Sequence, residues 1–148
     1  MLHELEKMCL VKDFDKEKAE QILKQIDIDQ EFVTSDHGYK TTFLDYAATF
    51  ANYGMVKLLL ENGANPNLLY DNGTENVLWN LQYSEDQTEI NDIRLEIVKL
   101  LLENGADPHI KVEGEDLYHW ATACWQDDMG TQAEYRGRFI DLLEDYGA

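Results

Sequence analysis

The stretch that decides the fold is Met55-Val56-Lys57-Leu58-Leu59-Leu60-Glu61-Asn62-Gly63-Ala64-Asn65-Pro66-Asn67, because the chain repeats it. Residues 97–109 repeat it with few changes, and residues 139–148 repeat it in a more divergent form. The glycines near the ends of the three copies, Gly63, Gly105 and Gly147, follow one another at intervals of 42 residues. A fixed period of this length predicts stacked structural repeats.

Each copy predicts a helix with a defined end. Val56, Leu59 and Leu60 form an apolar stripe at helical spacing, and Gly63 can adopt the left-handed conformation that terminates a helix. A shorter helix, which Thr42 can cap, is predicted before the first copy. Residues 1–30 predict one more helix pair, which lacks the Gly-Ala ending. A terminal repeat with a single neighbour is expected to be irregular in this way.

The segment Thr42-Phe43-Leu44-Asp45-Tyr46-Ala47-Ala48, followed by residues 56–67, resembles the ankyrin repeat. That family's pattern is Gly-x-Thr-Pro-Leu-His-x-Ala-Ala, then a reversal, then Val-x-x-Leu-Leu-x-x-Gly-Ala-Asp-x-Asn. No repeat here keeps the proline, and only His119 keeps the histidine. The resemblance implies an all-α ankyrin-repeat solenoid of stacked antiparallel helix pairs with short β-hairpin-like connecting loops. We expect one domain over residues 1–148, with approximate repeats 1–38, 39–71, 72–112 and 113–148.

The second and third repeats contain acidic insertions between their paired helices. Compared with the first clear repeat, they carry nine and ten extra residues, within residues 82–90 and 123–139. We expect both insertions to project from one edge of the stack. Their carboxylates would then form a second, electrostatic surface for a basic partner, or would only add solubility. The residues of this possible acidic edge are Glu85, Asp86, Asp127 and Asp128.

The charge of the chain narrows the choice of partner. Thirty acidic residues against twelve basic ones give a net charge of −18, spread along all 148 residues. Such a field repels nucleic acid and anionic membranes and speeds encounter with basic proteins. No apolar run is long enough for a membrane span, no secretory signal is visible, and Cys9 and Cys124 are far apart. We therefore expect a cytoplasmic monomer that binds neither nucleic acid nor membrane.

The family resemblance also implies where a partner would bind. Ankyrin-repeat proteins generally bind other proteins through the hairpin tips and the exposed side of each first helix. Three aromatic residues, Tyr46, Trp79 and Trp120, occupy equivalent positions in the first helices. They would form a row on the concave side, or would instead seal neighbouring repeats together. The full set of candidate contact residues is Tyr39, Tyr46, Thr49, Phe50, Asp71, Asn72, Thr74, Trp79, Tyr83, Val112, Glu113 and Trp120.

The sequence contains no pattern typical of catalysis or of metal binding. It has no nucleophile elbow, phosphate-binding loop or dinucleotide glycine motif, and its histidines are scattered. The acidic residues after Lys12 fail as a calcium loop because Lys18 stands where glycine is required. We therefore predict no enzyme activity, no cofactor and no metal.

The preferred interpretation is a non-enzymatic protein–protein interaction module. The alternative is an acidic inhibitor of the immunity type, which would neutralise a basic toxin or a nucleic-acid-binding protein. Two further hypotheses stay open at this point. One is an enzyme or metal-binding protein on an ankyrin scaffold, and the other is a structural module of a longer protein.

Overall fold

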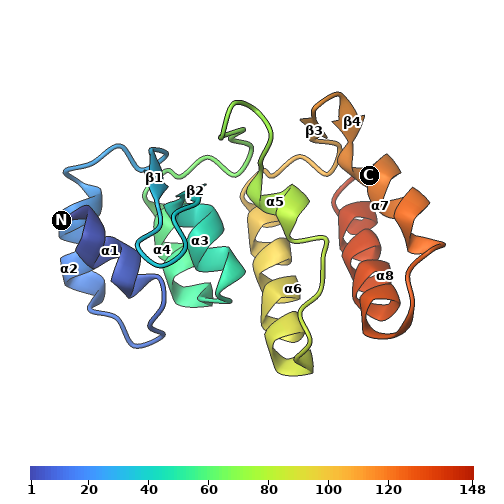
Figure 1. The fold of residues 1–148 in the computed structure, drawn as a ribbon, viewed down its shortest axis with the longest axis horizontal. Coiled ribbons are helices and arrows are strands. Elements are labelled where there is room, and N and C mark those ends of the chain that lie inside the picture. Colours follow the sequence, from blue (N-terminus) through green and yellow to red (C-terminus); the bar gives the residue numbers. More distant parts are fainter.

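The computed structural model describes all residues, 1–148, as a chain of short helices with three small hairpin-like connections (Figure 1). The helices come in consecutive pairs, and the strands lie between pairs. The elements in order are α1 (Leu2–Met8), α2 (Lys16–Leu23), β1 (Glu31–Val33), β2 (Lys40–Thr42), α3 (Phe43–Thr49), α4 (Tyr53–Glu61), α5 (Val77–Asn80), α6 (Thr88–Glu103), β3 (Lys111–Val112), β4 (Glu115–Asp116), α7 (Leu117–Trp125) and α8 (Gly130–Asp145).

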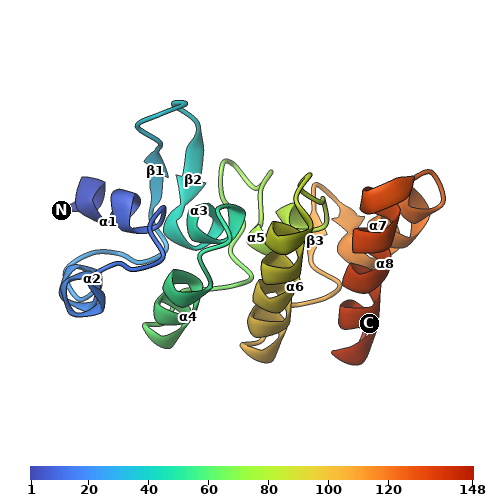
Figure 2. The ribbon, with the colours of Figure 1, turned by 90° about the horizontal axis from the view of Figure 1, so that it is seen from below.

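The four helix pairs lie side by side in the order of the sequence (Figure 1). Turning the molecule shows two layers: α1, α3, α5 and α7 lie in one, and α2, α4, α6 and α8 in the other (Figure 2). Within the second layer, α4 packs against α6 and α6 against α8. The predicted pairs of helices, including the irregular first pair, are therefore present.

Three hairpin-like connections join successive pairs, as the sequence predicted. β1 pairs with β2 in antiparallel register, with Phe32 opposite Thr41. Tyr70 and Glu75 form an isolated antiparallel bridge, and β3 pairs with β4. The second and third connections lie at the top of Figure 1, whereas the β1–β2 hairpin projects from the layer of α1 and α3 (Figure 2).

The ends of the helices follow from local sequence chemistry. The backbone N–H of Asp45 donates to the Thr42 hydroxyl (3.3 Å), so Thr42 caps α3 as predicted. Gly63, Gly105 and Gly147 have φ angles of 93°, 93° and 105°, which lie in the left-handed region. The same conformation thus ends α4, α6 and α8, so the divergent third copy is a true repeat.

The core runs through the whole row of helix pairs as one cluster of buried apolar side chains. The repeated leucine-rich helices supply its centre, with Leu59 and Leu101 fully buried at equivalent positions. Burying a leucine side chain stabilises a fold by roughly 1.5–3 kcal/mol, so this layer dominates the stability. None of the helices is both long enough and apolar enough to cross a membrane.

The inserted residues adopt a different structure from the projecting loops that the sequence suggested. α6 and α8 are 16 residues long, whereas α4 has only nine, because much of each insertion extends the following helix. Only residues 81–87 and 126–129 lie between the paired helices. The two reversals are therefore short, and the two lengthened helices, α6 and α8, pack against each other.

Candidate partner-binding surface

A buried polar residue recurs at one position of the last three repeats. Asn52, Arg94 and Arg136 are separated by 42 residues, and all three are buried. We call these three residues the polar ladder. The Asn52 amide Nδ2 donates to three backbone carbonyls at and just beyond the end of α1, those of Met8 (3.2 Å), Cys9 (3.0 Å) and Val11 (3.0 Å).

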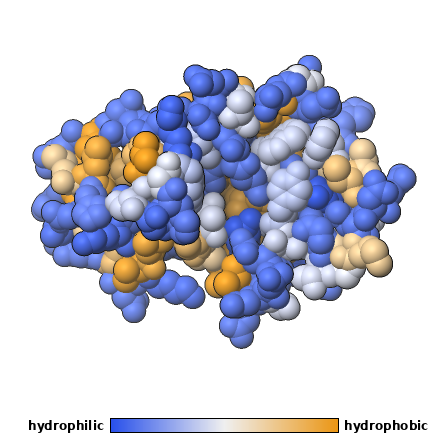
Figure 3. Space-filling view, viewed as in Figure 1, coloured by the Kyte–Doolittle hydropathy of each residue, from blue (hydrophilic) through white to orange (hydrophobic).

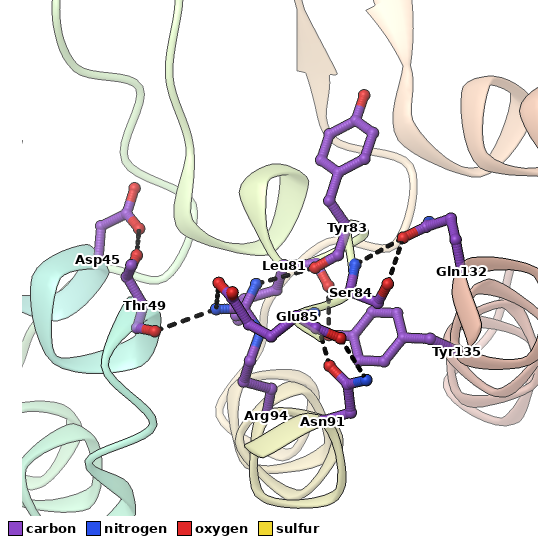
Figure 4. Close-up of polar contacts among 10 residues, drawn as sticks. All are labelled: Asp45, Thr49, Leu81, Tyr83, Ser84, Glu85, Asn91, Arg94, Gln132 and Tyr135. Atoms are coloured by element: carbon purple, nitrogen blue, oxygen red, sulfur yellow. Dashed lines mark hydrogen bonds and ion pairs between the residues drawn. The ribbon is translucent and has the colours of Figure 1, made fainter. Parts of the chain in front are cut away.

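The two arginines of the polar ladder also bind residues of the preceding first helix or of the segment that follows it. Arg94 donates to the carbonyl of Thr49 (3.1 Å), at the end of α3, and to the carbonyl of Tyr83 (3.0 Å) (Figure 4). Arg136 donates to the side chain of Gln82 and pairs with Asp128. Donors and cations are favoured at the carbonyl end of a helix. Asn52 and Arg94 thus bind backbone carbonyls at the end of the first helix in the preceding repeat, whereas Arg136 binds the Gln82 side chain just beyond the end of α5.

The reversal after α5 is held firmly against α8. The backbone N–H and the hydroxyl of Ser84 both donate to Gln132 Oε1, each at 2.7 Å. The Tyr135 hydroxyl donates to the carbonyl of Leu81 (2.5 Å) (Figure 4). Because its backbone groups are bonded on two sides, this reversal is a fixed support for the residue between them, Tyr83.

Three aromatic side chains meet on the surface above this support, and we call them the aromatic cluster: Trp79, Tyr83 and Trp120. The rings of Trp79 and Trp120 are 5.9 Å apart, and the Trp120 indole N–H donates to the Tyr83 hydroxyl (3.4 Å). The Arg136 guanidinium lies 5.0 Å from the centre of the Tyr83 ring, which points away from the backbone network (Figure 4). Tyr83 is 44% exposed and Trp120 is 38% exposed.

The surface around the aromatic cluster is less polar than its surroundings. A pale band in the space-filling view crosses the region of α5 and α7 and is bordered by hydrophilic side chains (Figure 3). Large amphipathic rings that stay exposed beside a polar border are typical of protein-binding surfaces.

Carboxylates on the hairpins give this side of the molecule a negative potential. Burial, together with the negative charges of Asp45, Asp71 and Glu113, raises the pKa of Glu75 above its ordinary value. None of the ion pairs in the structure involves Asp71, Glu75 or Glu113. Their charge is therefore not neutralised within the chain.

A buried carboxylate lies under the hairpins and was not anticipated. Asp45 is 3% exposed and accepts hydrogen bonds from the Tyr70 hydroxyl, the Asn80 amide (2.8 Å) and the Thr49 hydroxyl (3.2 Å). Burial raises its pKa, and the three hydrogen bonds oppose that effect. Asp45 thus connects α3 with the second hairpin and with α5.

Three of the residues that the sequence suggested as partner contacts are not free to make them. Tyr46 is 1% exposed and packs edge-on against Phe32 (5.7 Å) and Phe50 (5.0 Å), so it seals the repeats and does not join the aromatic row. Val112 belongs to β3 of the third hairpin, and its side chain is buried. Asp128 is largely buried against Arg136, so it is not part of an open acidic edge.

The other candidates are either exposed or partly exposed. The structure brings Trp79 and Trp120 together as predicted, but leaves Phe50 at the end of α3, against Tyr46. The exposed candidates are Tyr39, Phe50, Asn72, Thr74, Tyr83, Glu85, Asp86, Glu113, Trp120 and Asp127. Those of intermediate exposure are Thr49, Asp71 and Trp79.

The polar ladder is the feature that sequence reasoning missed, although a signal for it was present. Asn52, Arg94 and Arg136 each precede the apolar stripe of a repeated helix by the same number of residues. Aligning the repeats by their glycines places these three polar residues in register. A polar residue that recurs ahead of an apolar stripe indicates a buried contact between repeats.

Comparison with protein families agrees with the repeat pattern. Residues 40–71 and 89–112 match the family model described as Ankyrin repeat. The first match contains α3 and α4, and the second contains most of α6 together with β3. A search among curated proteins found no match to the chain.

Proposed function

We propose, from the premise that this chain is an ankyrin repeat protein, that it is a non-enzymatic module that binds a partner protein. Ankyrin repeats are generally protein–protein interaction modules. We infer that residues 1–148 form one solenoid domain with approximate repeats 1–38, 39–71, 72–112 and 113–148. Its binding surface is the concave side, which is formed by the first helices and the hairpins. We further propose that the module is a cytoplasmic monomer.

The observation that carries this proposal is the aromatic cluster of Trp79, Tyr83 and Trp120. Tryptophan and tyrosine are the side chains most enriched among residues that dominate binding energy. Here Tyr83 and Trp120 are exposed and Trp79 is half-buried, Trp120 contacts both of the others, and Tyr83 lies on backbone that Arg94 of the polar ladder holds in place. A surface that is already rigid loses little conformational entropy on binding, which favours affinity.

The carboxylates beside the cluster favour a basic partner. Asp71, Glu75 and Glu113 carry no counter-charge from the chain, and the net charge of −18 extends the same field over the whole molecule. Electrostatic complementarity of this kind mainly raises the rate of association. It also supports the alternative function, an immunity-type inhibitor of a basic toxin or of a nucleic-acid-binding protein. In both cases the partner meets the same surface.

The test is affinity purification from the native cells, with three tagged forms of the chain. We expect the wild-type chain to recover a specific partner, and a double variant, Tyr83→Ala with Trp120→Ala, to lose it. Residues that dominate an interface each contribute about 2 kcal/mol or more, roughly a thirtyfold change in affinity. The matched control is Tyr53→Ala with Tyr146→Ala, which removes two exposed tyrosines from other helices.

Circular dichroism would first establish that both double variants are folded. Equal recovery of the partner by the wild-type chain and by the Tyr83→Ala, Trp120→Ala variant would contradict the proposed surface. Loss of the partner from the control variant instead would move the binding surface to the helices of the second layer.

A further inference from the structure

A separate pocket lies where α3 ends and α6 begins. It has a volume of about 260 Å³ and is lined by Thr49, Phe50, Glu85 and Ile90. Glu85 and Ile90 belong to the first insertion, so the extra residues of this chain create the pocket. Cavities that enclose a whole small molecule are typically about 300–1,000 Å³. The size of this one suits a single long side chain.

The walls of the pocket are fixed before anything binds. Arg94 donates to the carbonyl of Thr49 on one wall, and its guanidinium is 3.7 Å from Glu85 Oε1 on the other. The side chain of Asn91, which is buried, accepts from the backbone N–H of Glu85 (2.7 Å) and donates to its carbonyl (2.9 Å) (Figure 4). Glu85 is thus held at the rim by both its backbone and its carboxylate.

The lining combines apolar walls with a negative rim. Phe50 is 45% exposed and Ile90 supplies the facing apolar surface, while the Glu85 side chain is 49% exposed. Asp86 and Glu89 follow nearby, and neither pairs with a cation in the structure. The positive end of α6 adds a charge equivalent of only about one half. Arg94 adds one full positive charge beside Glu85. Three carboxylates, those of Glu85, Asp86 and Glu89, outweigh both positive contributions, so this part of the chain stays net negative.

We propose that this pocket receives an arginine side chain from a basic segment of the partner. The aliphatic stem would lie along Ile90, and the guanidinium would stack on the Phe50 ring and pair with the Glu85 carboxylate. Arginine fits better than an apolar residue, which would remove water from the half-exposed Glu85 carboxylate and leave it only its 3.7 Å contact with Arg94. It also fits better than lysine, because a planar guanidinium can stack and pair at once. The inference rests on the proposed protein-binding function and adds a second anchor to it.

The experiment is an NMR titration of the ¹⁵N-labelled full chain with the peptide acetyl-Ala-Arg-Ala-amide. We expect saturable shift changes centred on the amides of Thr49, Phe50, Glu85 and Ile90. The comparison peptides, with lysine or norleucine in place of arginine, should bind at least about threefold and tenfold more weakly. Glu85→Gln should weaken arginine-peptide binding at least tenfold. Glu61→Gln, an exposed carboxylate on α4, should leave it unchanged.

A second variant guards against misfolding as an explanation. Ile90→Lys places a cation of the chain itself beside Glu85, and should abolish peptide binding while the dispersed spectrum of the folded chain is retained. Equal binding of the norleucine peptide, or shift changes spread over all acidic surfaces and unaltered by Glu85→Gln, would overturn the proposal. Partner recovery that still depends on Tyr83 and Trp120 would then leave the proposed function standing. If the arginine peptide binds as expected but partner recovery does not depend on Tyr83 and Trp120, the pocket proposal stands and the proposed binding surface fails.

Discussion

Replacing Arg136 with methionine is expected to lower the free energy of unfolding by about 3 kcal/mol or more, because a buried charge pair would lose one partner. Arg136 is 2% exposed and binds Asp128 and Gln82. Methionine keeps most of the side-chain volume but leaves the Asp128 carboxylate without its cation. Urea denaturation followed by circular dichroism would measure the change.

The matched control for this prediction is two residues away in the same helix. Arg138 pairs with Asp92 (2.8 Å), but both side chains are about half exposed. Exposed pairs of this kind contribute about 0–1 kcal/mol, so Arg138→Met should change stability little. If the two arginine variants lose equal stability, Arg136 does not connect the third and fourth helix pairs in the way described here.

Replacing Asp45 with alanine is expected to cost about 2–4 kcal/mol of stability, since it strips a buried network of its central acceptor. The Tyr70 hydroxyl and the Asn80 amide would both lose their bond to the Asp45 carboxylate. Tyr70 is itself buried, so water cannot easily replace the lost acceptor. The same urea measurement applies, and a loss below about 1 kcal/mol would contradict the role of Asp45 as the link between α3 and the second hairpin.

The conservative variant Asp45→Asn tests the charge of this residue separately from its hydrogen bonds. The asparagine oxygen can accept from Tyr70 and Asn80, and its amide can donate to the Thr49 hydroxyl. The folded state raises the pKa of Asp45, so the wild-type residue loses stabilising effect as the pH rises through that pKa and regains it in acid.

Asp45→Asn should therefore be at least as stable as the wild-type chain at pH 7. Its advantage should shrink as the pH is lowered toward 5, which still lies above the isoelectric point of about 4.3. Urea titrations of both proteins across this range would check the sign. An advantage that grows in acid would show that the folded state instead favours the charged form.

The parts of the fold that sequence could predict are those that depend on local chemistry. The cap at Thr42 and the helix ends at Gly63 and Gly105 follow from residues within one turn of each site. The burial of Tyr46 depends on Phe32, which reaches it from the first hairpin. Tyr46 occupies the same repeat position as Trp79 and Trp120. It alone is fully buried, because the hairpin beside it is longer than its counterparts.

The sequence predicted only the part of the candidate site that depends on the repeat pattern. The repeat period placed Trp79 and Trp120 in one row, and the structure brings their rings together. Arg94 and Arg136, in contrast, find partners 45 and 54 residues away. Their charge favoured a solvent-exposed position, and only the contacts between repeats explain why they are buried.

Hydrogen exchange of the chain, alone and bound to its purified partner, tests the central claim most directly. The claim is that the partner lies on the first helices and the hairpins. Bound chain should then exchange more slowly at residues 70–75, 79–84 and 111–121, while residues 53–61 of α4 stay unchanged. Slower exchange confined to α4, α6 and α8, which belong to the second layer, would contradict this claim.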